Sequence, residues 1–442
     1  MLEQLLRAAM QTLVQNGVLR SPADPAIEIV PTPDGHRGDF TSNLALRLAG
    51  ASTLSTHELA CQLVEALPRH SEVAHIDIAG PGFINFSLEK ETLFSVVPSI
   101  LSSGDAYGMI DAGSARHPRI RLVFGLGLPS GRLPLSAAPI FATGASVERL
   151  LTSTGTEVVC EYYIDNDRID SNSLSKCLED VNEFDIKIDN TILGAREDAL
   201  SAASNNFAPD SAFLIDTLEN TPDRLLCILS REQQLIMERL ESECSESRSS
   251  VNRLEFLLVP PAGWEGSAEV SSTAELHAAL GRDAVRYFCQ SRQDQAKIEL
   301  DLTTTGSRAG LRSLYSVQYA HARICSVLRQ ARDKGFEYDS RDSPAELALL
   351  VESQDSRLAA YLVAYLASFP TTVSIAAETR DPHRVKSYLQ ELANRLNKYD
   401  EAQKWLTENH SLRNARFSLL LATRQVLANG LELIGVGAPE VL

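Results

Sequence analysis

The apolar residues of the first 115 positions follow two different periods. Between positions 2 and 13 they repeat every three or four residues before Asn16-Gly17, which predicts an amphipathic helix. A second helix is predicted over residues 55–67, and after it apolar and polar residues alternate on both sides of Gly80-Pro81-Gly82. Alternation interrupted by such a turn predicts two antiparallel strands. We expect residues 1–115 to form a small α+β domain.

The next segment, residues 116–305, has the pattern of a parallel sheet. A continuous apolar strand is predicted over residues 119–124, a helix over 142–152 and a second strand over 157–164. Strand, helix and strand in this order are typical of a βαβ unit, whose strands lie parallel. Between about 170 and 250 the pattern indicates acidic helical stretches, and residues 253–259 predict one more strand.

From about residue 306 onward the apolar spacing is helical throughout. One stripe over residues 311–328 repeats at intervals of three and four, and further helices are predicted over 344–366, 383–406 and 412–434. Gly435 and Gly437 are expected to end the last helix. The predicted fold class is therefore α/β plus α.

Composition indicates a globular protein of a reducing compartment. Hydrophobic residues make up 44% of the 442 positions, and no 18 consecutive residues are apolar, which argues against a membrane-spanning helix. The N-terminus lacks the basic start and continuous apolar core of a signal peptide. Seven scattered cysteines without a Cys-x-x-Cys pair indicate neither a disulfide framework nor a zinc site. We expect a cytoplasmic protein that holds no metal.

Charge is distributed unevenly along the chain. The formal net charge is −17, and −15 of it lies within residues 151–300, whereas the last third is nearly neutral. Such an acidic excess argues against wholesale electrostatic capture of nucleic acid. The C-terminal third is the part least unfavourable for a polyanion.

Three stretches of the chain resemble the arginyl-tRNA synthetases. Residues 281–288, followed by 317–328, resemble the junction of the catalytic and anticodon-binding domains in that family. Asp381-Pro382-His383-Arg384 and residues 424–440 are similar to its helical anticodon-binding domain, and Gly38-Asp39-Phe40 with residues 78–85 is similar to its extra N-terminal domain.

The resemblance implies three domains in the family's order. Residues 1–115 would be the N-terminal domain, a small α+β domain. Residues 116–305 would be a degenerate, shortened catalytic domain with an abridged Rossmann-like parallel sheet. Residues 306–442 would be an all-α, anticodon-binding-type helical bundle.

The first ATP-binding element that the resemblance implies is missing. Class I synthetases hold ATP with a His-x-Gly-His element at a helix start, because adenylate formation develops negative charge on phosphates. The residues at that place are Pro134, Leu135, Ser136 and Ala137, with no imidazole. Pro134 and Pro139 are also expected to disturb the helix start that would present backbone N–H groups to a phosphate.

The second implied element, a Lys-rich loop that neutralises pyrophosphate, is also missing. It would lie near Trp264, but no Lys or Arg occurs between Arg253 and Arg282, and Glu265 has the wrong sign. The segment before it is markedly shorter than in the family, which is expected to remove much of the second half of the Rossmann fold. We therefore predict no catalytic residues, no cofactor and no aminoacylation activity.

Candidate RNA-binding residues lie on the first helix of the C-terminal third. They are aromatic, polar or basic: Arg312, Tyr315, Gln318, Tyr319, His321 and Arg323. Stacking of bases on aromatic rings, with Arg contacts to phosphates, is how single-stranded RNA is held. For Tyr319 and His321 a core aromatic and a hydrogen-bonded core histidine are equal alternatives. The family usually has Asn-Pro where Arg312-Ser313 stands, which weakens the match at this point.

The N-terminal segment offers two further candidates. Phe40 and Asn43 are predicted to contact an unstacked base of the tRNA D-loop. Helix capping explains Asn43 equally well.

Three functions remain open at this stage. The favoured one is a protein that binds tRNA, with arginine tRNA as the expected ligand, through its two end domains. The second is an active arginine–tRNA ligase that uses substitute residues with ATP, arginine and tRNA. The third is a scaffold or regulator that binds a protein partner through the acidic middle third. We expect no membrane partner in any of them.

Overall fold

The computed structural model describes residues 1–20, 27–32, 38–109, 119–125, 132–165, 171–194, 221, 223–246, 253–265, 270–290, 298–301, 307–339, 347, 349–350, 356–402 and 405–442. The chain divides into two compact units. The first comprises Met1–Tyr107, Arg323–Phe369 and Glu391–Val426, and the second comprises Gly108–Ala322, Pro370–Gln390 and Leu427–Leu442. Three long helices contribute residues to both units. The division into three domains at about residues 115 and 305 stays a prediction.

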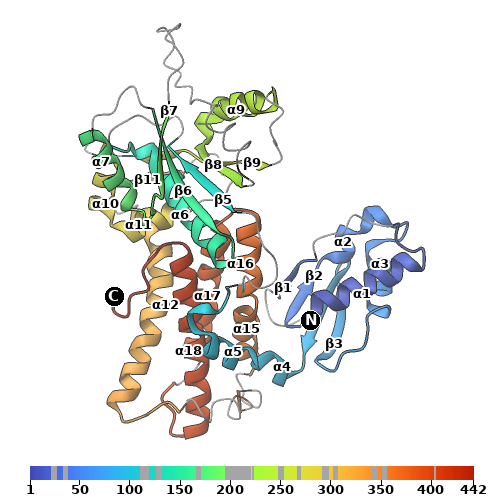
Figure 1. Ribbon diagram of the computed structural model, residues 1–442. Helices are drawn as coiled ribbons and strands as arrows, with labels where there is room; N and C mark the ends of the chain where they lie inside the picture. The colour runs from blue at the N-terminus through green and yellow to red at the C-terminus, as the bar shows by residue number, and fades with distance from the viewer. Residues whose placement is uncertain are drawn as a thin grey trace. The chain divides into compact units, whose positions relative to one another are not determined.

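The first unit begins with an antiparallel sheet in the order β1-β2-β4-β3. Its strands are β1 (Ile29–Pro31), β2 (Phe40–Ser42), β3 (Val73–Ala79) and β4 (Phe83–Leu88). The helices α2 (Leu44–Arg47) and α3 (Thr56–Glu65) pack on this sheet, and α1 (Leu2–Gln15) packs on α3 (Figure 1). The predicted helices and the predicted hairpin are confirmed.

Local chemistry explains where these helices begin and end. Gly17 follows α1 with φ +72°, a conformation that glycine adopts without a steric penalty. Ser55 caps α3, since its side chain accepts a hydrogen bond from the Glu58 backbone while the Glu58 side chain accepts one from the Ser55 backbone.

The rest of the first unit is helical. It contains α4 (Lys90–Phe94), α5 (Val96–Ser103), the 3₁₀ turns η1 (Ala49–Ala51) and η2 (Gly104–Ala106), α15 (Ser356–Ala367), and parts of α12, α17 and α18. α15 packs against α4, α5 and β1. The Arg395 guanidinium lies between the rings of Tyr361 and Tyr365, at 3.7 and 4.1 Å from their centroids, so a buried cation ties α17 to α15.

The second unit contains a parallel sheet in the order β7-β6-β5-β8-β9. Its strands are β5 (Ile120–Phe124), β6 (Val158–Asp165), β7 (Asn190–Gly194), β8 (Arg224–Ser230) and β9 (Leu254–Val259). β5, the first of these five strands along the chain, is central, and the strand order reverses beside it, as in doubly wound α/β folds. The predicted Rossmann-like sheet is therefore confirmed.

Both faces of this sheet are apolar and covered. Leu122, Phe124 and their neighbours pack against α6 (Ala138–Ser153), whereas Val123, Leu225 and Cys227 form a second cluster with Leu240 of α9 (Gln234–Glu246). α6 also contacts β6, β8 and β9. Figure 1 shows these helices on either side of the sheet.

The expectation that most of the second Rossmann half is lost was wrong for the sheet. β8 and β9 extend it on the far side of β5. The strand predicted over residues 253–259 is confirmed as β9, whereas β8 lies within a region that the pattern indicated as helical. Residues 225–230 are buried on both faces, and such a strand reads as a continuous apolar run without alternation. Apolar periodicity could not distinguish that run from a buried helix.

The remaining elements of the second unit lie between the strands of the parallel sheet or after its last strand. They are the 3₁₀ turns η3 (Leu135–Ala137) and η5 (Arg231–Gln233), α7 (Ser171–Asn182), α10 (Thr273–Leu280), α11 (Arg282–Cys289), and the parallel pair of β10 (Ala262–Glu265) and β11 (Ile298–Asp301). Neither strand of this pair was predicted.

The C-terminal third is helical over its described residues, as predicted. Besides α15 its helices are α12 (Ser307–Asp333), α16 (Phe369–Glu378), α17 (His383–Ala402) and α18 (His410–Leu433). α16 was not predicted. One stretch, Arg357–Glu378, has the length and apolar composition of a membrane-crossing helix, and 56% of its most apolar window is buried inside the protein.

Candidate functional site

One face of α12 carries a groove lined by two exposed tyrosines. Tyr315 and Tyr319 are 50% and 55% exposed, and Arg312 is exposed one turn before them. Positions 312, 315 and 319 share a helix face because they are three and four residues apart. Together with Ser316 and Leu442 they line an open groove of about 490 Å³.

The opposite face of α12 is what keeps the tyrosines outside. Leu314, Val317, Ala320 and Ile324 are buried. This apolar stripe fixes the rotation of the helix about its axis, so the tyrosine face stays in solvent. Arg312, Tyr315 and Tyr319 thus lie on one exposed face of α12. Their contact with RNA stays a prediction.

Three other predicted residues of α12 do not line the groove. Gln318 is buried and its Nε2 donates to Asp283 Oδ2 at 2.8 Å and to the Gly437 carbonyl at 3.0 Å. His321 is buried with Nδ1 2.8 Å from the Pro439 carbonyl oxygen. Of the two interpretations left open, Tyr319 is surface and His321 is a hydrogen-bonded core histidine.

Arg323, the third of these residues, pairs with a carboxylate in the first unit. Its Nε lies 3.2 Å from Asp400 Oδ2. An RNA phosphate would have to compete with this pair.

The bonds of Gln318 and His321 hold the last residues of the chain along α12. Gly437 makes two hydrogen bonds. Its carbonyl accepts from Gln318, and its N–H donates to Asp283 Oδ1 at 3.1 Å. The segment that continues from Gly437 reaches the groove as Leu442, which is 61% exposed. No local pattern indicates that the chain end lines this groove, because the contact depends on tertiary packing.

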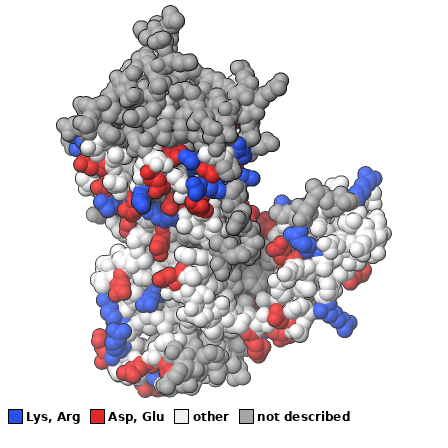
Figure 2. Space-filling model, viewed as in Figure 1, with Lys and Arg blue, Asp and Glu red and all other residues white. Residues whose placement is uncertain are grey.

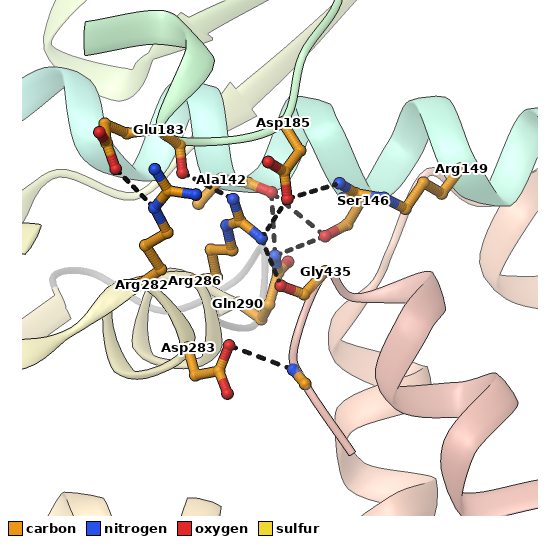
Figure 3. A network of polar contacts seen from close by, with 11 residues as sticks. Ala142, Ser146, Arg149, Glu183, Asp185, Arg282, Asp283, Arg286, Gln290 and Gly435 are labelled. Carbon is orange, nitrogen blue, oxygen red and sulfur yellow. Dashed lines mark hydrogen bonds and ion pairs between the residues drawn. The ribbon is translucent and has the colours of Figure 1, made fainter. Parts of the chain in front are cut away.

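A partly buried network links the same segment to α6 and α11 (Figure 3). Arg286, 6% exposed, donates to the carbonyls of Gly435 at 2.8 Å and Glu183 at 2.6 Å, and pairs with Asp185 at 2.6 Å. Arg149 of α6 lies 3.9 Å from the same Asp185 carboxylate. Burial, with the nearby Arg286 cation, lowers the pKa of Arg149.

A second buried contact ties α6 to the residue after α11. Gln290 Nε2 donates to the Ala142 carbonyl at 2.9 Å and to Ser146 Oγ at 2.7 Å. Lys386 Nζ donates to the carbonyls of Gln290 and Tyr287, both at 2.9 Å. Burial lowers the pKa of Lys386 to about 8.

At the predicted ATP element, Pro134 and Leu135 are half-buried, Ser136 is exposed and Ala137 is buried. Ala137 and Ala138 have no exposed surface and belong to the cluster of the sheet and α6. The backbone just before them is already engaged, because Leu133 N–H donates to Asp180 Oδ2 at 2.9 Å and its carbonyl accepts from the Thr273 N–H at 3.0 Å. A carboxylate thus holds a backbone donor beside the predicted ATP element.

The expectation that Pro139 disturbs this helix start was wrong. α6 begins at Ala138, four residues before the predicted start, with Pro139 in its first turn. Proline is tolerated there because the first N–H groups of a helix have no partner within the helix.

Behind this helix start two polar side chains are buried without partners. Neither ring nitrogen of His277 nor Thr273 Oγ1 has a hydrogen-bond partner among the described residues. His277 packs edge-on against Phe184 at 4.7 Å, and burial lowers its pKa. The sequence analysis did not single out either residue.

The loop after β5 and residues 266–269 lie outside the described residues. Trp264 lies in β10, paired in parallel with Leu300 of β11. The lack of Lys and Arg between Arg253 and Arg282 remains a property of the sequence.

In the N-terminal sheet, Phe40 is not on the surface. It is 8% exposed and pairs with Phe86, itself fully buried, so its ring faces the core. The expectation that Phe40 meets an unstacked base does not fit this placement. Asn43 stands at the N-cap of α2 without a side-chain capping bond, so the capping alternative was wrong, and its Oδ1 is buried without a partner among the described residues.

The other face of this sheet carries aromatic and apolar side chains that the sequence analysis missed. Phe83 is 38% and Val30 42% exposed. Phe83 follows the Gly80-Pro81-Gly82 turn and points away from the core by the alternation of β4. That alternation was readable in the sequence and could have identified it.

Comparisons with known proteins agree over the whole chain. Residues 1–88 match the arginyl tRNA synthetase N terminal domain, and residues 317–442 match the DALR anticodon binding domain. Two curated relatives, the arginine–tRNA ligases of Coxiella burnetii and Thioalkalivibrio sulfidiphilus, are 27% and 26% identical and are aligned over 99% of this chain and 98% and 99% of their own length. The chain belongs to the arginyl-tRNA synthetase family.

Solved structures show the same fold. The arginyl-tRNA synthetase of Thermus thermophilus matches with a TM-score of 0.74 at 17% identity, covering 100% of both chains. That of Plasmodium falciparum matches with a TM-score of 0.69 at 12% identity, covering 100% of this chain and 98% of its own. The alignment to the Coxiella synthetase spans 586 positions, more than the 442 residues here, so that relative has many residues without a counterpart in this chain.

Proposed function

We propose that this member of the arginyl-tRNA synthetase family binds tRNA, with arginine tRNA as the expected ligand, and does not charge it. The observation that carries the proposal is the groove on α12. Tyr315 and Tyr319 offer two exposed rings at adjacent turns, and Arg312 adds a cation on the same face. Unpaired bases stack on such rings while Arg contacts the adjoining phosphate.

The groove is also held rigidly, which favours binding. The bonds of Gln318, His321 and Asp283 fix the segment after Gly435 against α12 before any ligand arrives. A preorganised surface loses less conformational entropy on binding than a mobile one.

The proposed absence of charging rests on the helix start at Leu133–Ala138. A phosphate at a helix start needs unpaired N–H groups and nearby cations. Here the Leu133 N–H is bound to a carboxylate, Ala137 and Ala138 are in the core, and no histidine occurs among residues 132–138. These features support the proposal that this site no longer binds ATP.

The three domains proposed from the sequence fit this function. The N-terminal domain (1–115) would add a second RNA contact through the sheet face that exposes Phe83 and Val30. The domain of residues 116–305 would serve as a scaffold, and that of residues 306–442 would hold the anticodon-binding groove. We propose that the protein acts in the cytoplasm, where its tRNA ligand is found.

Fluorescence anisotropy with an arginine-tRNA transcript tests the binding. Tyr319→Ala and Tyr315→Ala should each weaken binding by about fivefold to a hundredfold, since stacking on one aromatic ring contributes about 1–3 kcal/mol per base. Tyr319→Phe is the matched control, because it keeps the ring. Unchanged affinity in both alanine variants, or no binding by the unaltered protein, would rule out the groove as the RNA site.

An active arginine–tRNA ligase is the second candidate, favoured by the end-to-end similarity to proteins named as such ligases. Arginine-dependent exchange of pyrophosphate into ATP separates the two. We expect no exchange above background. Turnover would show that other residues of this chain replace the missing element.

A further inference from the structure

A small polar pocket lies in the first unit, between the N-terminal sheet and α15. Its volume is about 220 Å³. The residues that line it are Thr32, Gly38, Asp39, Lys90, Arg357, Ala360, Tyr361 and Ala364. Pockets for drug-sized ligands span about 300–1,000 Å³, so this one suits a smaller metabolite.

The pocket is lined by one acidic and two basic side chains, those of Asp39, Lys90 and Arg357. The Asp39 side chain is only 10% exposed, whereas Lys90 is 41% exposed and Arg357 is exposed. Asp39 Oδ1 and Lys90 Nζ are 4.0 Å apart, which is a long ion pair. One oxygen of the carboxylate is satisfied, because Oδ2 accepts from the Leu88 N–H at 2.8 Å.

The carboxylate of Asp39 is incompletely compensated in this setting. Burial raises its pKa, and the bond from Leu88 and the charge of Lys90 only partly oppose the effect. An additional cation placed against Oδ1 would relieve the cost of keeping this charge buried.

The α15 wall of the pocket is small, apolar and rigid. Ala360 and Ala364 lie one turn apart on α15 and are buried, and Tyr361 lies between them in the chain. Arg395 stacks on the Tyr361 ring and donates to the Tyr361 carbonyl at 3.1 Å and the Thr32 carbonyl at 3.4 Å. This buried cation therefore holds both sides of the pocket at a fixed separation.

We propose that this pocket binds a free α-amino acid, with the ammonium at Asp39 and the carboxylate at Lys90 and Arg357. The alanines of α15 leave room for the side chain. A simple anion such as phosphate would meet the Asp39 carboxylate, and a simple cation would meet Lys90 and Arg357. Only a ligand with both charges complements all three groups.

Calorimetric titration of the full chain with each standard amino acid tests the proposal. We expect one or a few of them to bind at one site per chain. The N-acetyl and the amide derivatives of each amino acid that binds should bind at least about tenfold more weakly, because each loses one charge-assisted contact. Phosphate, acetate and methylammonium should not bind.

Two variants separate the pocket from other sites. Ala364→Leu fills the pocket from α15 and should abolish binding, while Arg357→Gln at the mouth should weaken it about tenfold. Arg332→Gln, an exposed arginine of α12 distant from the lining residues in sequence, is the matched control and should bind normally. Thermal unfolding of each variant shows whether it is folded.

Three results would overturn the proposal. They are the absence of heat with every amino acid, undiminished binding in folded Ala364→Leu and Arg357→Gln, and competition by phosphate alone. The last would assign the pocket to anions. None of these results bears on whether the α12 groove binds tRNA.

Discussion

At the scale of single residues, burial separates groups that the sequence presents as equivalent. Tyr319 and His321 both lie near the apolar stripe of α12, but two residues turn a helix by more than half a revolution. Tyr319 is therefore 55% exposed and His321 5%. The residue types suggested RNA binding for both, and helix packing decided which one can touch a ligand.

His277 is expected to be a cost to stability at acidic pH. Because burial lowers its pKa below the ordinary 6.5, the unfolded chain takes up a proton that folded His277 resists. The stability of the fold that holds neutral His277 is therefore fully present above pH 6.5. Part of it is lost as the pH falls through the folded pKa, because His277 must then be protonated while buried. His277→Leu should make the free energy of unfolding less sensitive to pH between 7 and 5, measured by urea denaturation.

His321→Leu is the matched control for this prediction. That histidine is also buried, but its Nδ1 bonds the Pro439 carbonyl. The control should lose about 1 kcal/mol at pH 7, whereas His277→Leu should lose little because its ring nitrogens have no described partner to leave behind. Equal losses at pH 7 would contradict the assignment of His277 as unpartnered.

Arg121 is expected to be the most sensitive charged residue of the parallel sheet. It donates to Glu161 at 2.6 Å and Asp223 at 2.8 Å, whose side chains are 2% and 8% exposed. Arg121→Met would leave two buried carboxylates without their cation and should cost about 3–5 kcal/mol in the free energy of unfolding.

Arg119 provides the control on the same stretch of chain. It pairs with Glu157 at 2.8 Å, but both side chains are largely exposed. Arg119→Met should cost less than about 1 kcal/mol. If the two variants lose the same stability in urea denaturation, burial is not what makes the Arg121 cluster important.

At the scale of elements, the approach of α6 to β5 depends on one glycine. A Cβ at Gly144 would lie 2.2 Å from the Phe124 ring and 2.9 Å from Ile228 Cδ1. Gly144→Ala should therefore destabilise the protein by about 1–3 kcal/mol, although alanine favours helices by about 1 kcal/mol elsewhere. The change in melting temperature measures it.

Gly50→Ala is the control for this substitution. No atom lies within 4 Å of a Cβ at Gly50. Its effect should stay within about 0.5 kcal/mol. A neutral Gly144→Ala would show that the helix and strand can separate without loss.

Most helices were predictable from the sequence and several strands were not. α1, α3, α17 and α18 each have an amphipathic stripe or a capping residue, which are local signals. β8 is stabilised by neighbours distant in the chain and has no surface face to create alternation. Only its pairing with β5 and β9 in the folded protein identifies it as a strand.

At the scale of the whole molecule, charge limits how RNA can be held. The net charge is −17, and acidic and basic side chains are interspersed over the described surface that Figure 2 shows. We expect tRNA binding to depend on stacking more than on counterion release. The plot of log affinity against log salt should have a shallow slope of about −2, with a loss of about 16-fold between 50 and 200 mM.

A steep salt dependence would change this conclusion. A slope near −5 or beyond would mean that many phosphates are neutralised, which a groove with Arg312 as its cation does not provide. Arg312→Gln should reduce the slope by about one unit, and Tyr319→Ala should lower the affinity without changing the slope.

The sequence by itself determined the family, the fold class and the absence of histidine from residues 134–137, because motifs, periodicity and residue identity are local properties of the chain. Tertiary structure decided the rest. It placed Phe40 in a core, Leu442 beside Tyr319 and Asp39 opposite Arg357, since these placements depend on how distant segments pack. Residue type sets what a side chain can do, and packing sets what it can reach.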